Sequence, residues 1–197
     1  MTVKEGTLLW EPSEELKREA VITDYINWLN KEKGLSIKEY HELWEWSVQH
    51  VEDFWQSIWD YYQVESYSDY EYVLESETMP RAKWFNGATL NYAEHILRND
   101  QGDKVAIYAA SETRPYLELT WDELINQTAA LAAYLRKNGV ERGDVVASYM
   151  PNIPETVVAF LATVSIGAIW SSCAPEFGFG STIDRFKQIE PKILFTV

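Results

Sequence analysis

Cysteine and long apolar runs are almost absent from this chain, and each scarcity excludes a class of protein. Cys173 is the only cysteine, so no internal disulfide can form, which favours a reducing compartment. No stretch approaches the roughly 18 apolar residues that a transmembrane helix needs. Residues 1–5 offer no apolar core for a signal peptide. These absences predict a cytoplasmic protein.

Basic residues are also scarce, because 17 Lys and Arg stand against 31 Asp and Glu, a net charge of −14. Residues 1–80 hold 6 basic and 18 acidic residues (−12), and residues 81–197 hold 11 and 13 (−2). An acidic surface repels phosphate backbones and anionic lipid headgroups, so neither nucleic acids nor membranes are expected as partners. The hydrophobic fraction of 46% is typical of a folded domain.

Three histidines are too few and too scattered to indicate a metal centre. His41, His50 and His95 lack the spacing of metal ligands and are interpreted as ordinary surface or boundary residues. Residues 171–173 (Ser-Ser-Cys) are candidate nucleophiles without a recognisable base. We therefore assign no catalytic residue and no metal ligand.

Tryptophan, by contrast, is abundant near the start, with six of the nine before residue 60. Residues 1–82 are predicted to form an acidic, Trp-rich helical region. Pro12 and Ser13 indicate a helix start, with helical spacing continuing to Gly34, and residues 36–39 read as a capping box for a second helix.

The clearest helical pattern in this region runs from Val51 to Tyr62, where large apolar residues recur at i, i+3, i+4, i+7, i+8 and i+11. We interpret this stripe as a packing face, with a ligand-stacking platform or a docking face as the alternative. Residues 66–82 are predicted to be an irregular acidic connection and residues 84–87 a turn.

Residues 83–197 alternate short apolar runs with helical patterns, and this alternation predicts an α/β fold. Residues 105–108 and 116–119 read as a hairpin, and Thr120 opens a helix with a capping box. Strands are then expected at 145–149, 168–170 and 193–197. Between them we expect a helix that Pro151 and Pro154 start and another that starts at Ser181. Such near-continuous apolar strands favour a mostly parallel sheet with helices on both faces. Because the last apolar run, 193–197, has no loop after it, we expect only the first βα units of a larger domain, and an exposed sheet edge that favours self-association.

Residues 178–181 (Gly-Phe-Gly-Ser) lie between a predicted strand and a helix, where backbone N–H groups can hold an anion. The segment lacks the third glycine of a dinucleotide fingerprint and the Lys-Ser/Thr of a P-loop. It is therefore interpreted as a flexible strand-to-helix loop in the first instance, and as a phosphate site only as an alternative.

Several segments of the chain are distinctive in combination: 9–13 (LWEPS), 43–48 (LWEWSV), 54–55 (FW), 84–94 (WFNGATLNYAE), 119–124 (LTWDEL), 143–147 (GDVVA), 150–155 (MPNIPE) and 169–178 (IWSSCAPEFG). Together they resemble the acetyl-CoA synthetase-like branch of the acyl-adenylate-forming (AMP-binding) enzymes, and within it the acetoacetyl-CoA synthetases. The resemblance covers nearly the whole chain, and its specificity lies in the combination.

This resemblance implies the N-terminal part of an acetoacetate–CoA ligase. Such an enzyme first converts ATP and the carboxylate to an acyl-adenylate, with Mg²⁺ offsetting phosphate charge, and CoA then attacks the acyl carbon. The family's phosphate loop, nucleotide contacts, acid pocket and catalytic lysine have no counterpart here, so the resemblance implies a fragment that is inactive by itself and has no ATP, CoA or Mg²⁺ bound. By position, Phe177, Gly178 and Arg185 resemble the part of the family's N-terminal lobe near the CoA nucleotide.

Three alternatives remain open. Arg185 is alternatively interpreted as an arginine on the helix surface that bonds to neighbouring side chains such as Asp184. A full enzyme that is another short-chain acyl-CoA synthetase is the runner-up in the same class, and the acid pocket of the missing portion would separate the two. A non-catalytic interaction module that uses the Trp-rich helices for docking belongs to a different class, and exposure of Trp44, Trp55 and Trp59 is the feature that distinguishes it.

Overall fold

The computed structural model describes residues 4–197, and these form two compact units that divide between residues 88 and 89. Residues 1–3, which contributed to the expectation of no signal peptide, lie outside the described residues. Residues 83–88 belong to the first unit by their contacts, and the predicted domain border between 82 and 83 stays a prediction.

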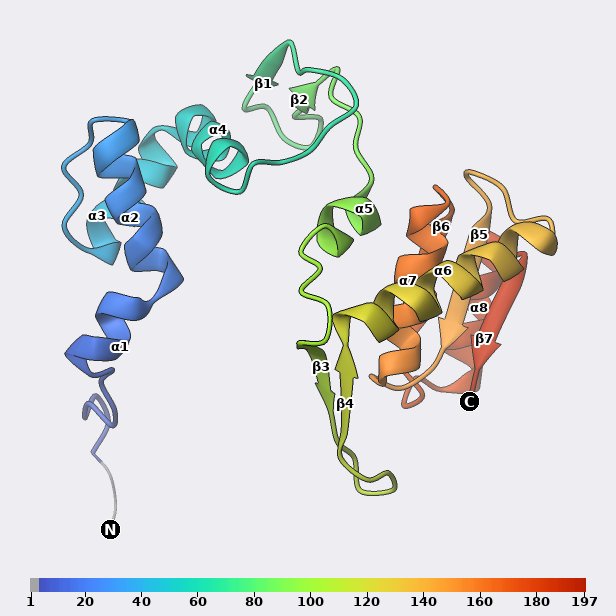
Figure 1. Cartoon of the computed structure of the whole chain (residues 1–197). Helices are drawn as coiled ribbons and strands as arrows, with labels where there is room; N and C mark the ends of the chain where they lie inside the picture. The colour runs from blue at the N-terminus through green and yellow to red at the C-terminus, as the bar shows by residue number, and fades with distance from the viewer. Residues whose placement is uncertain (1–3) are drawn as a thin grey trace. The chain divides into compact units, whose positions relative to one another are not determined.

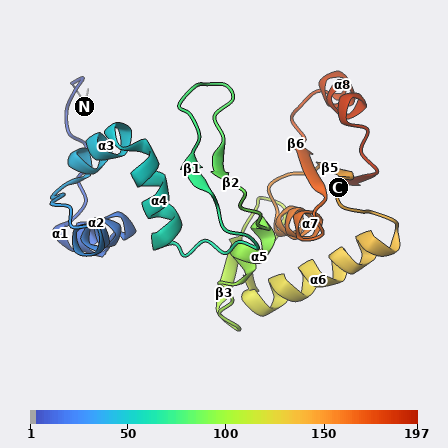
Figure 2. The ribbon, with the colours of Figure 1, turned by 90° about the horizontal axis from the view of Figure 1, so that it is seen from above.

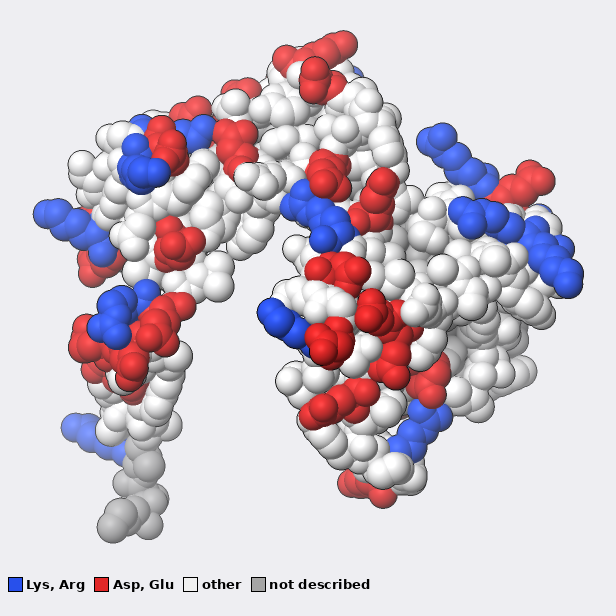
Figure 3. Space-filling model, in the orientation of Figure 1, with Lys and Arg blue, Asp and Glu red and all other residues white. Residues whose placement is uncertain are grey.

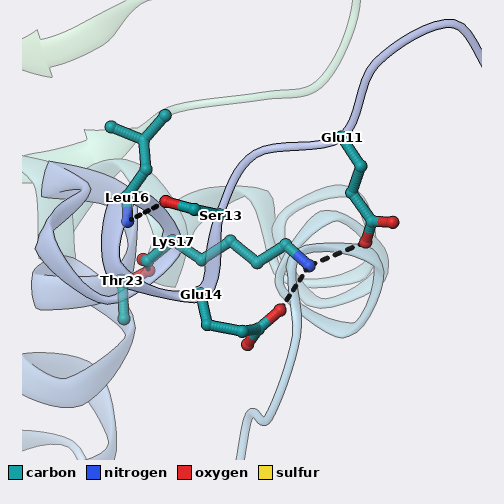
Figure 4. Close-up of polar contacts among 6 residues, drawn as sticks. All are labelled: Glu11, Ser13, Glu14, Leu16, Lys17 and Thr23. Atoms are coloured by element: carbon teal, nitrogen blue, oxygen red, sulfur yellow. Dashed lines mark hydrogen bonds and ion pairs between the residues drawn. The ribbon is translucent and has the colours of Figure 1, made fainter.

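The first helix begins where the sequence predicts it. Ser13 caps α1 (Glu14–Glu19) because its Oγ accepts a backbone N–H from the first turn at 3.2 Å (Figure 4). Lys17 lies between Glu11 and Glu14, with Nζ 2.8 Å from a carboxylate oxygen of each. Its hydrogen bonds, to Glu11 first and Glu14 second, raise the pKa of Lys17. Figure 3 shows the wider pattern: acidic side chains gather around α1, with basic ones among them.

The helix predicted to run on to Gly34 is interrupted, so that prediction is wrong in detail. Ala20 is extended, with a ψ of 137°, and separates α1 from α2 (Val21–Glu32). Thr23 stabilises the break because its hydroxyl donates to the carbonyl oxygen of Lys17, which has lost its helical partner. A side-chain bond of this kind leaves no signal in hydrophobic periodicity.

The next helix, α3 (Tyr40–Gln49), starts later than the predicted capping box at 36–39. Its N-cap is Glu39, which makes no side-chain cap, and the carboxylate of Glu42 instead accepts the Lys38 N–H at 2.6 Å. The helix predicted from the apolar stripe is confirmed as α4 (Val51–Tyr61).

The α2, α3 and α4 helices share one small apolar core. Its buried members are Tyr25, Ile26, Leu29, Ile37 and Leu43. From the α4 stripe, Phe54 and Ile58 pack against this core, whereas the indole of Trp55 remains 43% exposed. The stripe is thus only partly a packing face within the described residues.

A short antiparallel hairpin replaces the irregular connection and turn that the sequence predicts. It pairs β1 (Tyr72–Leu74) with β2 (Trp84–Asn86). Val73 is buried, and the Phe85 ring stacks on Trp59 of α4 with centroids 4.5 Å apart. Strands of three residues, joined by a long loop, carry too few alternations to be recognised from sequence.

The second unit opens with α5 (Tyr92–Leu97), a hairpin and a long helix, as the sequence predicts. The strands β3 (Val105–Ala109) and β4 (Leu117–Thr120) pair antiparallel. Then α6 (Trp121–Lys137) begins at a complete capping box, in which Thr120 Oγ1 accepts the Glu123 N–H at 3.2 Å and the Glu123 carboxylate accepts the Thr120 N–H at 2.9 Å.

The remaining strands form a parallel sheet in the order β6-β5-β7. It joins β5 (Val145–Tyr149), β6 (Ile169–Cys173) and β7 (Ile193–Thr196) through α7 (Pro154–Ser165) and α8 (Phe179–Ile189). The strand predicted at 168–170 and the helix predicted from 181 are therefore longer than expected: β6 includes residues 171–173, and α8 starts two residues earlier.

Helices cover both faces of this sheet, which confirms the predicted α/β class. Val146 packs with Leu135 of α6 and Ala162 of α7, while Ala147, the next residue on β5, packs with Phe186 of α8. Figures 1 and 2 show α6 and α7 on one side of the strands and α8 on the other.

Candidate functional site

The candidate site predicted from the sequence lies on the loop between β6 and α8, residues 174–178. The loop turns because the Phe177 N–H donates to the Ala174 carbonyl at 3.0 Å. Gly178 is the N-cap of α8, and a Cβ added to it would meet no atom within 4 Å. The loop thus leaves open space beside the start of the helix, at the carboxyl end of β6, where α/β sheets bind their ligands.

Arg185 lies over the ring of Phe177, with Cζ 5.1 Å from the ring centroid. This is the geometry of a cation–π contact. Phe177 is 41% exposed, and Arg185 is exposed as well. Among the described residues Arg185 makes no ion pair, so the contact with Asp184 considered from the sequence is not the one formed. Two of the three predicted residues therefore touch, and the third is adjacent in the chain.

The electrostatics of this end of α8 favour an anion. The first turn has no acidic residue, and Gly178 supplies no side-chain cap. The backbone N–H groups of residues 179–181 therefore have no helical acceptor and point outward with the positive end of the helix dipole. Arg185 adds a full positive charge on the same helix, whereas Glu176 in the loop and Asp184 on the helix oppose it.

Sequence reasoning missed Tyr149, the last residue of β5. Its hydroxyl donates to the carbonyl oxygens of Pro175 at 2.6 Å and Phe177 at 3.0 Å. The tyrosine and the two acceptors are 26 and 28 residues apart, so only the parallel pairing of β5 with β6 brings them together. A tyrosine that ends a central strand directly before Met-Pro is the only signal in the sequence.

The candidate nucleophiles at 171–173 lie within β6 rather than on a loop. Cys173 is 3% exposed and packs with Ala147 and Phe186. Among residues 4–197, no group of three His, Cys, Asp or Glu side chains is placed to hold a metal ion. Among the hydrogen bonds of the described residues, none joins the side chains of residues 171–173 to a histidine, lysine or carboxylate that could act as a base.

A second hollow, of about 520 Å³, lies between the β3–β4 loop and the start of α7. Arg114, which lines this hollow, contacts Glu155 of α7, with Nη1 2.7 Å from Oε1. The pKa of Glu155 is lowered, first by a hydrogen bond from its own backbone N–H and then by Arg114. Tyr108 and Tyr116 stack at its rim with centroids 6.4 Å apart.

The sequence patterns of two known families match this chain. The pattern described as AMP-binding enzyme matches residues 94–197, more than half of the chain, and the acetyl-coenzyme A synthetase N-terminus pattern matches residues 40–96. The chain belongs to the AMP-binding enzyme family. The candidate site on the β6–α8 loop lies inside the part that matches this family.

Within this family, the chain is similar to several acetoacetyl-CoA synthetases. An acetoacetyl-CoA synthetase of Xenopus tropicalis is 38% identical over 99% of the chain, and one of Rhizobium meliloti is 38% identical over 94%. A solved acetoacetyl-CoA synthetase of Streptomyces lividans is 44% identical over 95% of the chain, with a TM-score of 0.87.

The chain spans 28–30% of the length of these three proteins. The likeness expected from the sequence is therefore confirmed, and it covers a minority of each relative. Within the described residues, every helix is too short or too polar to cross a membrane.

Proposed function

We propose that this chain is part of an ATP-dependent acetoacetate–CoA ligase. In the first step the carboxylate of acetoacetate attacks the α-phosphorus of ATP, which forms acetoacetyl-adenylate and releases pyrophosphate. In the second step the CoA sulfur attacks the acyl carbon, loses its proton and displaces AMP. Mg²⁺ offsets the phosphate charge, and the reaction takes place in the cytoplasm.

The observation that carries this proposal is the likeness along nearly the whole chain to acetoacetyl-CoA synthetases, at 38–44% identity. Because the chain matches only 28–30% of the length of these proteins, we assign it a supporting rather than a catalytic part. The groups that bind ATP and acetoacetate then belong to the remainder of the protein.

Within this reaction, Phe177, Gly178 and Arg185 are assigned to the phosphate-bearing nucleotide half of CoA. The planar guanidinium of Arg185 matches phosphate oxygens in a two-bonded arrangement. Gly178 leaves room for a ligand at the start of α8, where three backbone N–H groups lack acceptors. The chemistry of the loop therefore fits a phosphate-bearing ligand.

The test uses the full-length protein that carries this sequence, supplied with ATP, CoA and Mg²⁺. Acetoacetate is expected to give AMP, pyrophosphate and acetoacetyl-CoA, with a higher kcat/KM than acetate or propionate. Preference for acetate or propionate would instead identify another short-chain acyl-CoA synthetase. Micromolar ATP binding by the 197-residue chain alone, measured by calorimetry, would contradict the assignment of the ATP-binding groups to the remainder of the protein.

The isolated chain is also expected to associate with itself. β6 and β7 are both edges of the parallel sheet, and Leu194 on β7 is exposed. An unpaired strand edge with an apolar side chain pairs readily with another strand. Light scattering on the 197-residue chain should show a mass that rises with concentration, and a constant monomer mass at high concentration would reject this expectation.

A docking role for the Trp-rich helices is the second candidate. The exposure of Trp44 and Trp55 favours it, whereas Trp59 is half-buried and stacks on Phe85. Trp44 is 47% exposed and lines an apolar hollow of about 400 Å³ among α2, α3 and α4, with Val21 and Tyr40 beside it. Acrylamide quenching distinguishes the two candidates: these tryptophans become shielded in a full-length ligase, and they stay accessible in a docking module without its partner.

A further inference from the structure

Tyr149 anchors the 174–178 loop to the central strand of the sheet. Its hydroxyl has one proton, which the carbonyl oxygens of Pro175 and Phe177 share at 2.6 and 3.0 Å. Its ring packs against the buried cluster of Ala147, Cys173 and Phe186, beneath α8. The anchor therefore combines a ring held in the core with a hydroxyl that reaches the loop.

Few other contacts hold this loop in place. Within it, the Phe177 N–H bonds to the Ala174 carbonyl. On its far side, Thr182 Oγ1 donates to the Gly178 carbonyl at 3.3 Å. In the part of the chain that the structure describes, no side chain outside the loop and α8 other than Tyr149 donates a hydrogen bond to residues 174–178.

The position of Phe177 sets the position of Arg185. An arginine side chain carries several rotatable bonds, and its guanidinium is exposed here. The Phe177 ring, 5.1 Å from Cζ, restricts where the guanidinium lies. A displacement of the Phe177 backbone therefore moves the ring and releases the arginine, which raises the cost of ordering it against a phosphate.

We infer that Tyr149 is a positioning residue for CoA, acting through the Phe177 backbone and ring on the Arg185 guanidinium. The inference rests on the proposed function, since it concerns the same candidate site. Tyr149 does not touch the ligand in this scheme. Its hydroxyl pre-orders the loop, so that the phosphates of the nucleotide half meet a guanidinium already in place.

The test compares the 197-residue chain with its Tyr149→Phe variant, which removes one oxygen and keeps the ring. The probe is adenosine 3′,5′-bisphosphate, the nucleotide half of CoA, titrated by NMR because part of a site binds weakly. In the wild type, shifts are expected at residues 177–185. In the variant, the dissociation constant should rise about three- to tenfold, the loss expected for one hydrogen bond.

A spectroscopic signature separates positioning from a general loss of structure. In the wild type, we expect the ring current of Phe177 to move the Arg185 side-chain protons upfield, because the guanidinium lies over the ring. Tyr149→Phe should diminish this shift without a ligand present. Phe177→Leu should do the same. Tyr134→Phe is the matched control, because this exposed tyrosine lies on α6 and its hydroxyl makes no hydrogen bond among the described residues; neither property should change.

The outcomes distinguish this inference from the function on which it rests. If the wild type shows no shifts with the bisphosphate, both the CoA assignment and the role of Tyr149 fall. If it binds and Tyr149→Phe binds equally well, only the role of Tyr149 is rejected. The role of Tyr149 is also rejected if the variant loses affinity while the upfield shift of the Arg185 protons is unchanged. In that case the hydroxyl does not act through the Phe177 ring and the Arg185 guanidinium.

Discussion

If the proposed function holds, replacing Arg185 with alanine in the full-length protein is expected to raise the KM for CoA about 10- to 100-fold. A charge-assisted hydrogen bond contributes roughly 1.5–3 kcal/mol, and each 1.4 kcal/mol is a factor of about ten. The KM for acetoacetate should stay within about twofold, because the assigned contact is with the nucleotide of CoA. Steady-state kinetics with each substrate varied in turn measures both.

Two further variants sharpen this experiment. Arg185→Lys keeps the charge and loses the planar fork, so its KM for CoA should lie between those of the wild type and the alanine variant. Arg136→Ala removes an exposed arginine from the last turn of α6 and should change neither KM. An unchanged KM for CoA in Arg185→Ala would remove this residue from the site.

The second large effect concerns the core of the parallel sheet. Leu135→Ala is expected to lower the free energy of unfolding by about 2–5 kcal/mol, the usual cost of a buried leucine. Leu135 on α6 is fully buried and packs in one cluster with Val146 of β5 and Ala162 of α7, so its loss opens a cavity between helices and sheet. Urea unfolding followed by circular dichroism gives the difference.

The matched control is Leu117→Ala on β4, because Leu117 is 50% exposed. This change removes the same atoms from a site that water already reaches, and it should cost less than about 1 kcal/mol. Equal losses in the two variants would show that the unit does not depend on the α6–sheet core.

Local signals in the sequence predicted most of the second unit. Thr120 and Glu123 form a capping box within four residues, and Pro154 fixes the first turn of α7, so both helices begin where expected. The hydrophobic strands between them predicted a parallel sheet with two covered faces. Each of these features depends on residues that are close in the chain.

The features that the sequence did not reveal depend on residues far apart or on single side chains. The β1–β2 pair joins Tyr72 to Asn86, and the break at Ala20 depends on one threonine hydroxyl. The residues of the candidate site also fall into those that the sequence revealed and those that it did not. A family likeness was enough to name Phe177, Gly178 and Arg185, and the tether from β5 became visible only with the chain folded.

The order β6-β5-β7 also has a consequence for synthesis on the ribosome. The strand in the middle is the first of the three to be translated, and each later strand is added at a free side. No strand has to be inserted between two that are already paired. The sheet can therefore form outward from β5, which is synthesised first, as the polypeptide leaves the ribosome.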